Sequence, residues 1–157
     1  MLLMINKIIS GGQTGVDRAA LDVAIALNIP HGGWCPQGRI AEDGVISLQY
    51  QLQETPTADY SERTAWNVRD SDGTLLITRG QLIGGTQLTL EIAQLFKKPY
   101  FIMDLTLTPD MATVLSWFNA NNIRVLNIAG ARESQSPGIY QLTVVQLQQL
   151  LKPYLKA

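Results

Sequence analysis

The residues best suited to chemistry lie in a loop near the start of the chain, at 10–18, which reads SGGQTGVDR. The loop has no lysine, so it is not a Walker phosphate loop, and its G-G-x-x-G spacing is not the dinucleotide-binding G-x-G-x-x-G. A glycine loop at the start of a helix exposes backbone N–H groups, and the helix dipole adds partial positive charge there. Such a loop can hold a phosphate or pyrophosphate without a cationic side chain. A tight strand-to-helix turn would explain the glycines as well.

Two further glycine-bearing segments follow predicted strands: GGT at 84–86 and AGARES at 129–134. Because strand-to-helix loops of a parallel sheet all lie at its carboxyl edge, we expect the three segments to open into one cleft. Three such loops favour an anion-binding cleft over three unrelated tight turns. The predicted ligand-binding residues are Gly11, Gly12, Gln13, Thr14, Gly15, Arg39, Arg63, Asn67, Gly84, Gly85, Thr86, Arg132 and Ser134.

Several of these side chains have a specific reason to be included. Arg63 and Asn67 lie four positions apart, so they share one face of a predicted helix. Arg39 and Arg132 are arginines in loops, and a guanidinium suits bidentate phosphate binding. A solvated helix face with an Arg63–Asp59 ion pair explains the first two residues as well, and surface charge alone explains Arg39 and Arg132. Glu91 follows the second glycine segment and is placed to act as a general acid or base, or to be a surface glutamate.

The composition excludes several other kinds of site. The chain has one histidine, His31, and one cysteine, Cys35, so a histidine triad, an intramolecular disulfide and a cysteine metal site are not expected. We predict no protein metal ligands and a buried Cys35 thiol. A net charge of −1 argues against nucleic-acid binding. No apolar stretch approaches the roughly eighteen residues that span a bilayer, so we expect no membrane association and a cytoplasmic location.

Short apolar runs alternate with helical patterns along the chain. This alternation predicts a three-layer, Rossmann-like α/β fold in which helices flank a mostly parallel central sheet. We expect a single domain over residues 1–157, with Thr14 and Asp17 capping the first helix. The predicted strands are 7–10, 31–34, 74–78, 99–103 and 124–128. The predicted helices start near 14, 59, 88, 109 and 137, the last ending near 155, and 36–44 is predicted to be a loop.

Five blocks in order resemble the molybdenum carrier family of the SLOG superfamily, which is similar to molybdenum cofactor carrier protein. They are GGQTGVDRAALDVA, GGWCPQGRIAEDG, YSERTAWNVRDSDGTLLIT, GGTQLTLEIA and AGARESQSPGIY, and they cover nearly the whole chain from Ile8 to Tyr140. The resemblance implies a Rossmann-like fold, a homo-oligomer, and a cleft for a small phosphorylated or nucleotide-derived ligand. The family name implies molybdenum cofactor as cargo, carried without catalysis.

Two alternatives come from the same superfamily. The lonely-guy phosphoribohydrolases cleave nucleoside monophosphates and carry P-G-G-x-G-T-x-x-E. Here Gly84, Gly85 and Glu91 fit that spacing, but Gln87 and Leu88 replace the inner Gly-Thr pair, and Ile83 replaces the proline. Glu91 would be the catalytic residue of such an enzyme. The other alternative is a sensor that binds a nucleotide or ADP-ribose without turnover. A shared fold does not separate these functions.

Overall fold

The computed structural model describes residues 5–154 and is built on a five-stranded parallel sheet of order β2-β1-β9-β7-β8. In chain order the strands are β1 Lys7–Ile9, β2 His31–Gly32, β7 Gly73–Thr78, β8 Tyr100–Asp104 and β9 Val125–Gly130. All six residues of β7 are buried, as expected for a central strand covered on both faces. The predicted α/β class and parallel sheet are confirmed.

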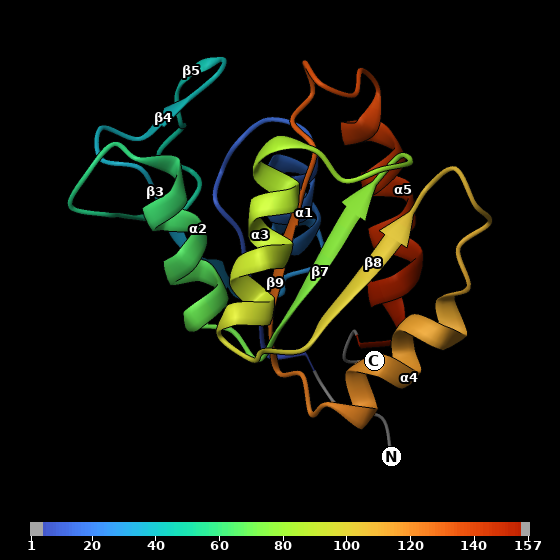
Figure 1. The fold of residues 1–157 in the computed structure, drawn as a ribbon. Coiled ribbons are helices and arrows are strands. Elements are labelled where there is room, and N and C mark those ends of the chain that lie inside the picture. The colour runs from blue at the N-terminus through green and yellow to red at the C-terminus, as the bar shows by residue number, and fades with distance from the viewer. Residues whose placement is uncertain (1–4, 155–157) are drawn as a thin grey trace.

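Helices cover both faces of this sheet (Figure 1). They are α1 Val16–Ala26, α2 Tyr60–Arg69, α3 Gly84–Leu95, α4 Met111–Ala120 and α5 Ile139–Leu151, followed by a 3-10 turn at Lys152–Tyr154. α3 lies in front of the sheet with α2 beside it, and α1 and α5 lie behind (Figure 1). None of the helices within residues 5–154 has the length and apolar character needed to cross a bilayer.

The two faces of the sheet differ in polarity. On the face covered by α1, α4 and α5, side chains such as Ile8, Leu75 and Ile128 are fully buried in the main apolar core. On the α3 face, Thr74 of β7 and Asn127 of β9 are neighbours in register, and both are buried. The Asn127 amide donates to the Thr74 hydroxyl at 3.1 Å. A buried, hydrogen-bonded polar pair therefore lies beneath α3, where the core of a protein is ordinarily apolar.

The segment between β2 and α2 leaves the sheet and forms two small structures of its own. β3 (Trp34–Cys35) pairs with β6 (Gln53–Glu54), and β4 (Ile40–Ala41) pairs with β5 (Gly44–Val45) as a hairpin. This hairpin lies partly within the segment predicted to be a loop, and it projects at the upper left of Figure 1. Cys35 is fully buried, as predicted, and burial raises the pKa of its thiol.

Three local predictions need correction. Thr14 does not cap α1, because Gly15 is the N-cap residue and no side chain caps this helix within the described chain. α3 begins at Gly84, so the second glycine segment forms the first helical turn and not a loop. The last regular helix ends at Leu151. The predicted end near Leu155, and the apolar start at 1–4, fall outside the described residues.

Candidate functional site

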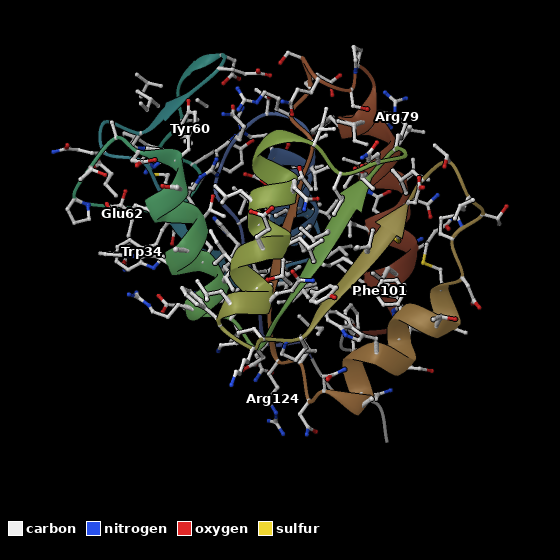
Figure 2. All side chains as sticks on the ribbon, viewed as in Figure 1. Trp34, Tyr60, Glu62, Arg79, Phe101 and Arg124 are labelled. Atoms are coloured by element: carbon white, nitrogen blue, oxygen red, sulfur yellow. The ribbon has the colours of Figure 1, made fainter. Side chains whose placement is uncertain are left out.

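The carboxyl ends of β1, β9 and β7 are adjacent in the sheet, so the segments that follow them meet at one edge. Tyr60 and Arg79 lie toward this edge, whereas Arg124, just before β9, lies at the opposite one (Figure 2). A cavity of about 230 Å³ opens there between α2 and α3, above β9. The convergence expected from the three glycine-bearing segments is therefore present in the structure.

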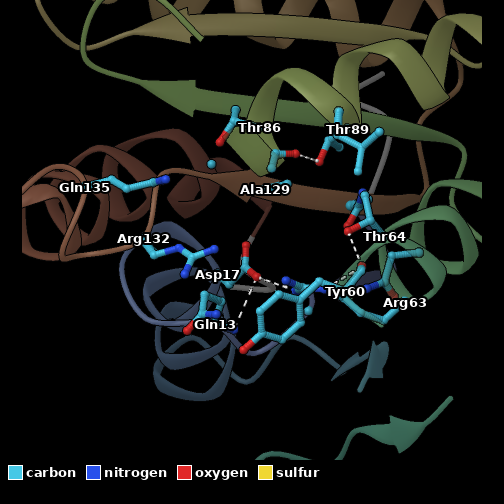
Figure 3. A pocket seen from close by; sticks show the side chains of 16 residues that line it. Gln13, Asp17, Tyr60, Arg63, Thr64, Thr86, Thr89, Ala129, Arg132 and Gln135 are labelled. Atoms are coloured by element: carbon cyan, nitrogen blue, oxygen red, sulfur yellow. Dashed lines mark hydrogen bonds and ion pairs between the residues drawn. The ribbon is translucent and has the colours of Figure 1, made fainter. Parts of the chain in front are cut away.

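Seven of the predicted ligand-binding residues line the cavity. They are Gly11, Gln13, Arg63, Asn67, Gly85, Thr86 and Arg132. Figure 3 shows Gln13, Arg132 and Gln135 on one side, Tyr60, Arg63 and Thr64 on the other, and Thr86 and Thr89 across the top. The Asn67 amide accepts from the Trp34 N–H at 2.8 Å and donates to the Trp34 carbonyl at 3.0 Å. Asn67 thus ties α2 to β3 while it lines the cavity.

The other predicted residues are not among the lining residues. They are Gly12, Thr14, Gly15, Arg39, Gly84 and Ser134, together with Glu91 as the candidate acid or base. Glu91 lies on the exposed face of α3, where it accepts a hydrogen bond from Gln87 at 3.3 Å. The α3 side chains that face the cavity are instead Thr86, Leu88 and Thr89. The structure therefore does not bring Glu91 to a ligand in this cavity.

Arg39 has a structural position in place of the predicted ligand contact. Its guanidinium donates to the backbone carbonyls of Ile46, Ser47, Tyr50 and Leu52 at 2.8–3.1 Å. Its own backbone has a φ of 54°, in the left-handed region that residues other than glycine rarely adopt. The four hydrogen bonds offset this strain and hold the chain between β4 and β6. Arg39 is therefore committed to the fold, which corrects its prediction as a phosphate ligand.

Sequence reasoning missed several lining residues. They are Asp17, Tyr60, Thr64, Leu88, Thr89, Asn127, Ala129, Gly130 and Gln135. One of them left a signal in the sequence, since Asn127 is a single amide inside the apolar run RVLNI. A buried polar residue in a central strand needs a partner, so it marks a polar site next to the sheet.

A buried ion pair forms one wall of the cavity. The Arg63 guanidinium donates to the Asp17 carboxylate at 3.1 Å, and the two side chains are 12% and 7% exposed. Gly11 makes this possible, because a Cβ there would lie 1.8 Å from the Arg63 Nη1. Burial raises the pKa of Asp17, although the charge of Arg63 and a hydrogen bond from the Gln13 N–H act in the opposite direction. Arg63 therefore lines the cavity, but its positive charge is largely balanced by the Asp17 carboxylate.

Gln13 has an unusual pair of environments. Its side-chain Oε1 accepts from the N–H groups of Glu42 at 2.9 Å and Thr14 at 3.1 Å. Since both partners are donors, the oxygen must face them and the Nε2 must face the other way. Gln13 is 6% exposed and lines the cavity, and its Nε2 has no hydrogen-bond acceptor among residues 5–154. An unpaired buried donor costs about 1–3 kcal/mol, so Gln13 carries an unmet hydrogen bond next to the cavity.

Glu42, at the tip of the β4–β5 hairpin, closes the gap between two of the glycine-bearing segments. Its carboxylate accepts from the Thr14 hydroxyl, from the Ser134 N–H at 3.2 Å and from the Ser134 hydroxyl at 2.6 Å. Burial of the carboxylate raises its pKa, but the hydrogen bonds from Ser134 and Thr14 outweigh burial and hold the pKa below its usual value. Ser134, predicted to contact ligand, is therefore engaged by Glu42.

Most amides around the start of α1 are also engaged. The Gln13 N–H donates to Asp17 at 3.2 Å, the Thr14 N–H to the Gln13 side chain, and the Val16 N–H to the Ala131 carbonyl at 3.1 Å. Gly15 adopts a φ of 78°, and a Cβ there would lie 2.3 Å from the Ala131 carbonyl oxygen. The tight-turn explanation therefore accounts for the glycine at this position.

The start of α3 is different. Its N-cap position is Ile83, which has no capping side chain, and no other described side chain caps the helix. A Cβ added at Gly85 would meet nothing within 4 Å. The open space at Gly85 faces the cavity, and Thr86 lies beside it. The first turn of α3 therefore offers backbone donors to a bound anion.

No cluster of three or more His, Cys, Asp or Glu side chains suited to hold a metal ion occurs within the described part of the chain. The donors that line the cavity are amide, hydroxyl and guanidinium groups. Their chemistry suits an anionic or polar organic ligand, and any metal that enters would do so with ligands of its own.

Comparisons with known proteins agree with this architecture. The model of the circularly permutated YpsA SLOG family matches residues 8–151. A crystal structure of a protein from Syntrophus aciditrophicus SB named "Putative molybdenum carrier protein" superposes with a TM-score of 0.93. The two chains are 50% identical, and the match covers 97% of this chain and 98% of the other. A search of curated proteins found no match.

Proposed function

Because the chain belongs to the circularly permutated YpsA SLOG family, we propose that it is a carrier that holds a small phosphorylated molecule in the cavity between α2 and α3. Molybdenum cofactor is the first candidate, since the similar Syntrophus protein is named as a molybdenum carrier. The observation that carries the proposal is the polar lining of this cavity, where Arg132 and the uncapped start of α3 lie with Gln13, whose buried Nε2 has no acceptor among the described residues.

The cavity suits an elongated ligand with a charged head and a polar, uncharged body. The charged head would lie near Arg132, Gln13 and Gly85, and the body would contact Thr64, Thr89 and Asn127. A phosphorylated pterin has this division of charge. The metal of a molybdenum cofactor would keep the sulfur ligands that it brings, as cargo, because the cavity offers hydrogen-bond donors and no thiolate.

The lining residues suit a protein that carries its ligand better than one that catalyses a reaction on it. A general acid or base must lie within hydrogen-bond reach of the group on which it acts. Asp17 is the one carboxylate among the described residues that line the cavity, and it is bound to Arg63 and to the Gln13 N–H. A carrier needs only to hold its ligand, shield it from oxidation and release it.

Retention and protection of the ligand test this function. The protein is mixed anaerobically with molybdenum cofactor freshly released from a molybdenum enzyme, separated from free cofactor by gel filtration, and then exposed to air. We expect cofactor to elute with the protein and to oxidise more slowly than free cofactor. Arg132→Met is the comparison variant and should retain less. Equal oxidation rates with no co-elution would contradict the proposal.

We also expect the carrier to be a homo-oligomer. The resemblance to the molybdenum carrier family implies this, and large apolar side chains on α3 and the edge strand β8 are exposed, among them Leu95, Tyr100 and Ile102. Light scattering coupled to gel filtration measures the mass directly. A mass of one 17.3 kDa chain at all concentrations would count against it.

A further inference from the structure

We infer that the protein has a second binding site, for a small aromatic carboxylate, in a cavity beside the amino ends of β1 and β9. This cavity has a volume of about 410 Å³, and its lining includes Lys7, His31, Gly32, Trp34 and Asp70. It shares no lining residue with the cavity between α2 and α3. The second site therefore goes beyond the proposed function and does not depend on it.

The fold brings distant parts of the chain together at this cavity. Lys7 and Val125 are the first residues of β1 and β9, and they are neighbours in register. Asp70 is the C-cap residue of α2, and Trp34 begins β3. Trp34 lies on the side of α2 away from α3 (Figure 2). The cavity is thus formed where the end of α2 meets the edge of the sheet.

Lys7 supplies a positive charge that the protein does not neutralise. It forms no ion pair among the residues that the structure describes. A Cβ added at Gly32 would lie 3.0 Å from the Lys7 Cε and 3.2 Å from its Nζ, so the lysine side chain lies across this glycine. Because Gly32 has no side chain, it leaves room for the ammonium group at β2. This ammonium group is available to bind an anion.

His31 adds a second donor beside this charge. Its Nε2 accepts from the Gln51 backbone N–H at 3.1 Å, which is the only hydrogen bond of the His31 side chain among the described residues. A backbone N–H can only donate, so Nε2 carries no proton and Nδ1 carries the proton of the neutral ring. Burial and the charge of Lys7 lower the pKa of His31, so the ring is neutral at neutral pH. An unpaired N–H donor thus belongs to a residue that lines the cavity near Lys7.

Trp34 gives the cavity an aromatic wall that is fixed before a ligand binds. Its backbone N–H donates to the Asn67 side-chain oxygen at 2.8 Å, and its carbonyl accepts from the Asn67 amide at 3.0 Å. Its indole N–H donates to the Asp70 carboxylate at 2.8 Å, and its ring packs edge-to-face with Trp66 at a centroid distance of 4.6 Å. An indole held in this way loses little further entropy on binding. It favours a ligand with an aromatic body.

Charge favours a monocarboxylate over a more highly charged anion. Asp70 lines the same cavity, and its carboxylate accepts from Arg69 at 2.8 Å and from the Trp34 indole. The hydrogen bond from Arg69, together with that from Trp34, holds the pKa of Asp70 below its usual value, so this carboxyl group is ionised at neutral pH. Lys7 brings one positive charge, and Asp70 would repel a second negative charge on the ligand. A carboxylate therefore fits better than a phosphate ester.

The test compares benzoate, which has both ring and charge, with acetate, which lacks the ring, and benzamide, which lacks the charge. Each is titrated into the full-length ¹⁵N-labelled protein and followed by NMR. We expect benzoate to shift the backbone amides of Gly32 and Gly33 and the indole N–H of Trp34. It should bind about fivefold or more tightly than either comparison compound. No shifts of these groups with benzoate at about 20 mM, or equally tight binding of acetate or benzamide, would overturn the inference.

Variants of two lining residues test the assignment of the charge. Lys7→Met removes the ammonium group of an exposed side chain, so benzoate should bind at least about tenfold more weakly. Lys152→Met, in the exposed 3-10 turn after α5, removes the same charge elsewhere and is the matched control. Gly32→Ala should also weaken binding, because its methyl group displaces the Lys7 ammonium. Unchanged benzoate affinity in both Lys7→Met and Gly32→Ala, or an equal loss in Lys152→Met, would overturn the inference.

Discussion

The side-chain oxygen of Gln13 accepts a hydrogen bond from the backbone N–H of Glu42 at 2.9 Å, and this bond fixes the orientation of the Gln13 amide. The β4–β5 hairpin that carries Glu42 therefore holds a side chain of the first glycine-bearing segment in place. The two residues are 29 positions apart along the chain, so a distant segment fixes the side chain of a residue that lines the cavity.

Gly85→Ala separates ligand binding from stability. A Cβ at this position meets nothing within 4 Å, and alanine favours helices more than glycine does. We expect the variant to be as stable as the wild type or more stable by up to about 1 kcal/mol, and to bind phosphorylated ligand more weakly because its methyl group occupies space beside Gly85 that the charged head of the ligand would use. Thermal unfolding and ligand titration measure the two effects.

Gly15→Ala is the matched glycine control. Its Cβ would lie 2.3 Å from the Ala131 carbonyl oxygen at a φ of 78°, so the variant should lose at least about 2 kcal/mol of stability. If Gly85→Ala loses as much stability as Gly15→Ala, the open space assigned to Gly85 is wrong.

Arg39→Met should destabilise the fold and leave ligand affinity unchanged. The four carbonyl groups that Arg39 binds would lose a charged donor, which we expect to cost roughly 2–4 kcal/mol of unfolding free energy. Urea unfolding measures this cost, and titration with ligand below the unfolding range measures affinity. A variant of normal stability that has lost ligand binding would restore Arg39 to the ligand site.

The elements that sequence analysis predicted correctly are those with strong local signals. β7 and β9 are compact apolar runs, and Asp59 caps α2 through a hydrogen bond to the Ser61 N–H, so their positions follow from nearby residues. The error at α3 has the same origin, because glycines are typical of loops in a sequence, whereas here Gly84 and Gly85 begin a helix and Gly85 lines the cavity.

The site was harder to predict, because its polar contacts join segments far apart in the chain. Arg63 meets Asp17 across 46 positions, and Ser134 meets Glu42 across 92. Hydrophobic periodicity carries no information about such pairs. Sequence analysis therefore identified Arg63 and Arg132 as cavity residues but could not anticipate that internal carboxylates occupy two of the three glycine-bearing segments.

Glu42→Gln should lower stability in a pH-dependent way. The pKa of Glu42 in the folded protein lies below its ordinary value of 4.5, so the ionised carboxylate stabilises the fold above that value and this stabilisation is lost as the pH falls through the folded pKa. The unfolding temperature of the variant should be lower than that of the wild type near neutral pH, and the two should converge in acid. A gap that does not change with pH would show that ionised Glu42 does not hold the hairpin.

Adenosine 5′-monophosphate distinguishes binding from hydrolysis. Glu91 lies on the exposed face of α3 and not in the cavity, so we expect the protein to release no adenine from this nucleotide. Chromatography of long incubations measures the free base. Adenine release that is abolished by Glu91→Gln would instead establish a phosphoribohydrolase.

The central claim is that this cavity carries a phosphorylated small molecule, and native mass spectrometry of anaerobically isolated protein tests it most directly. The account predicts that the wild type retains a non-covalent, phosphorus-containing molecule and that Gly85→Ala, although folded, retains much less. Wild-type protein that carries no such mass, or an equal amount on the Gly85→Ala variant, would contradict it.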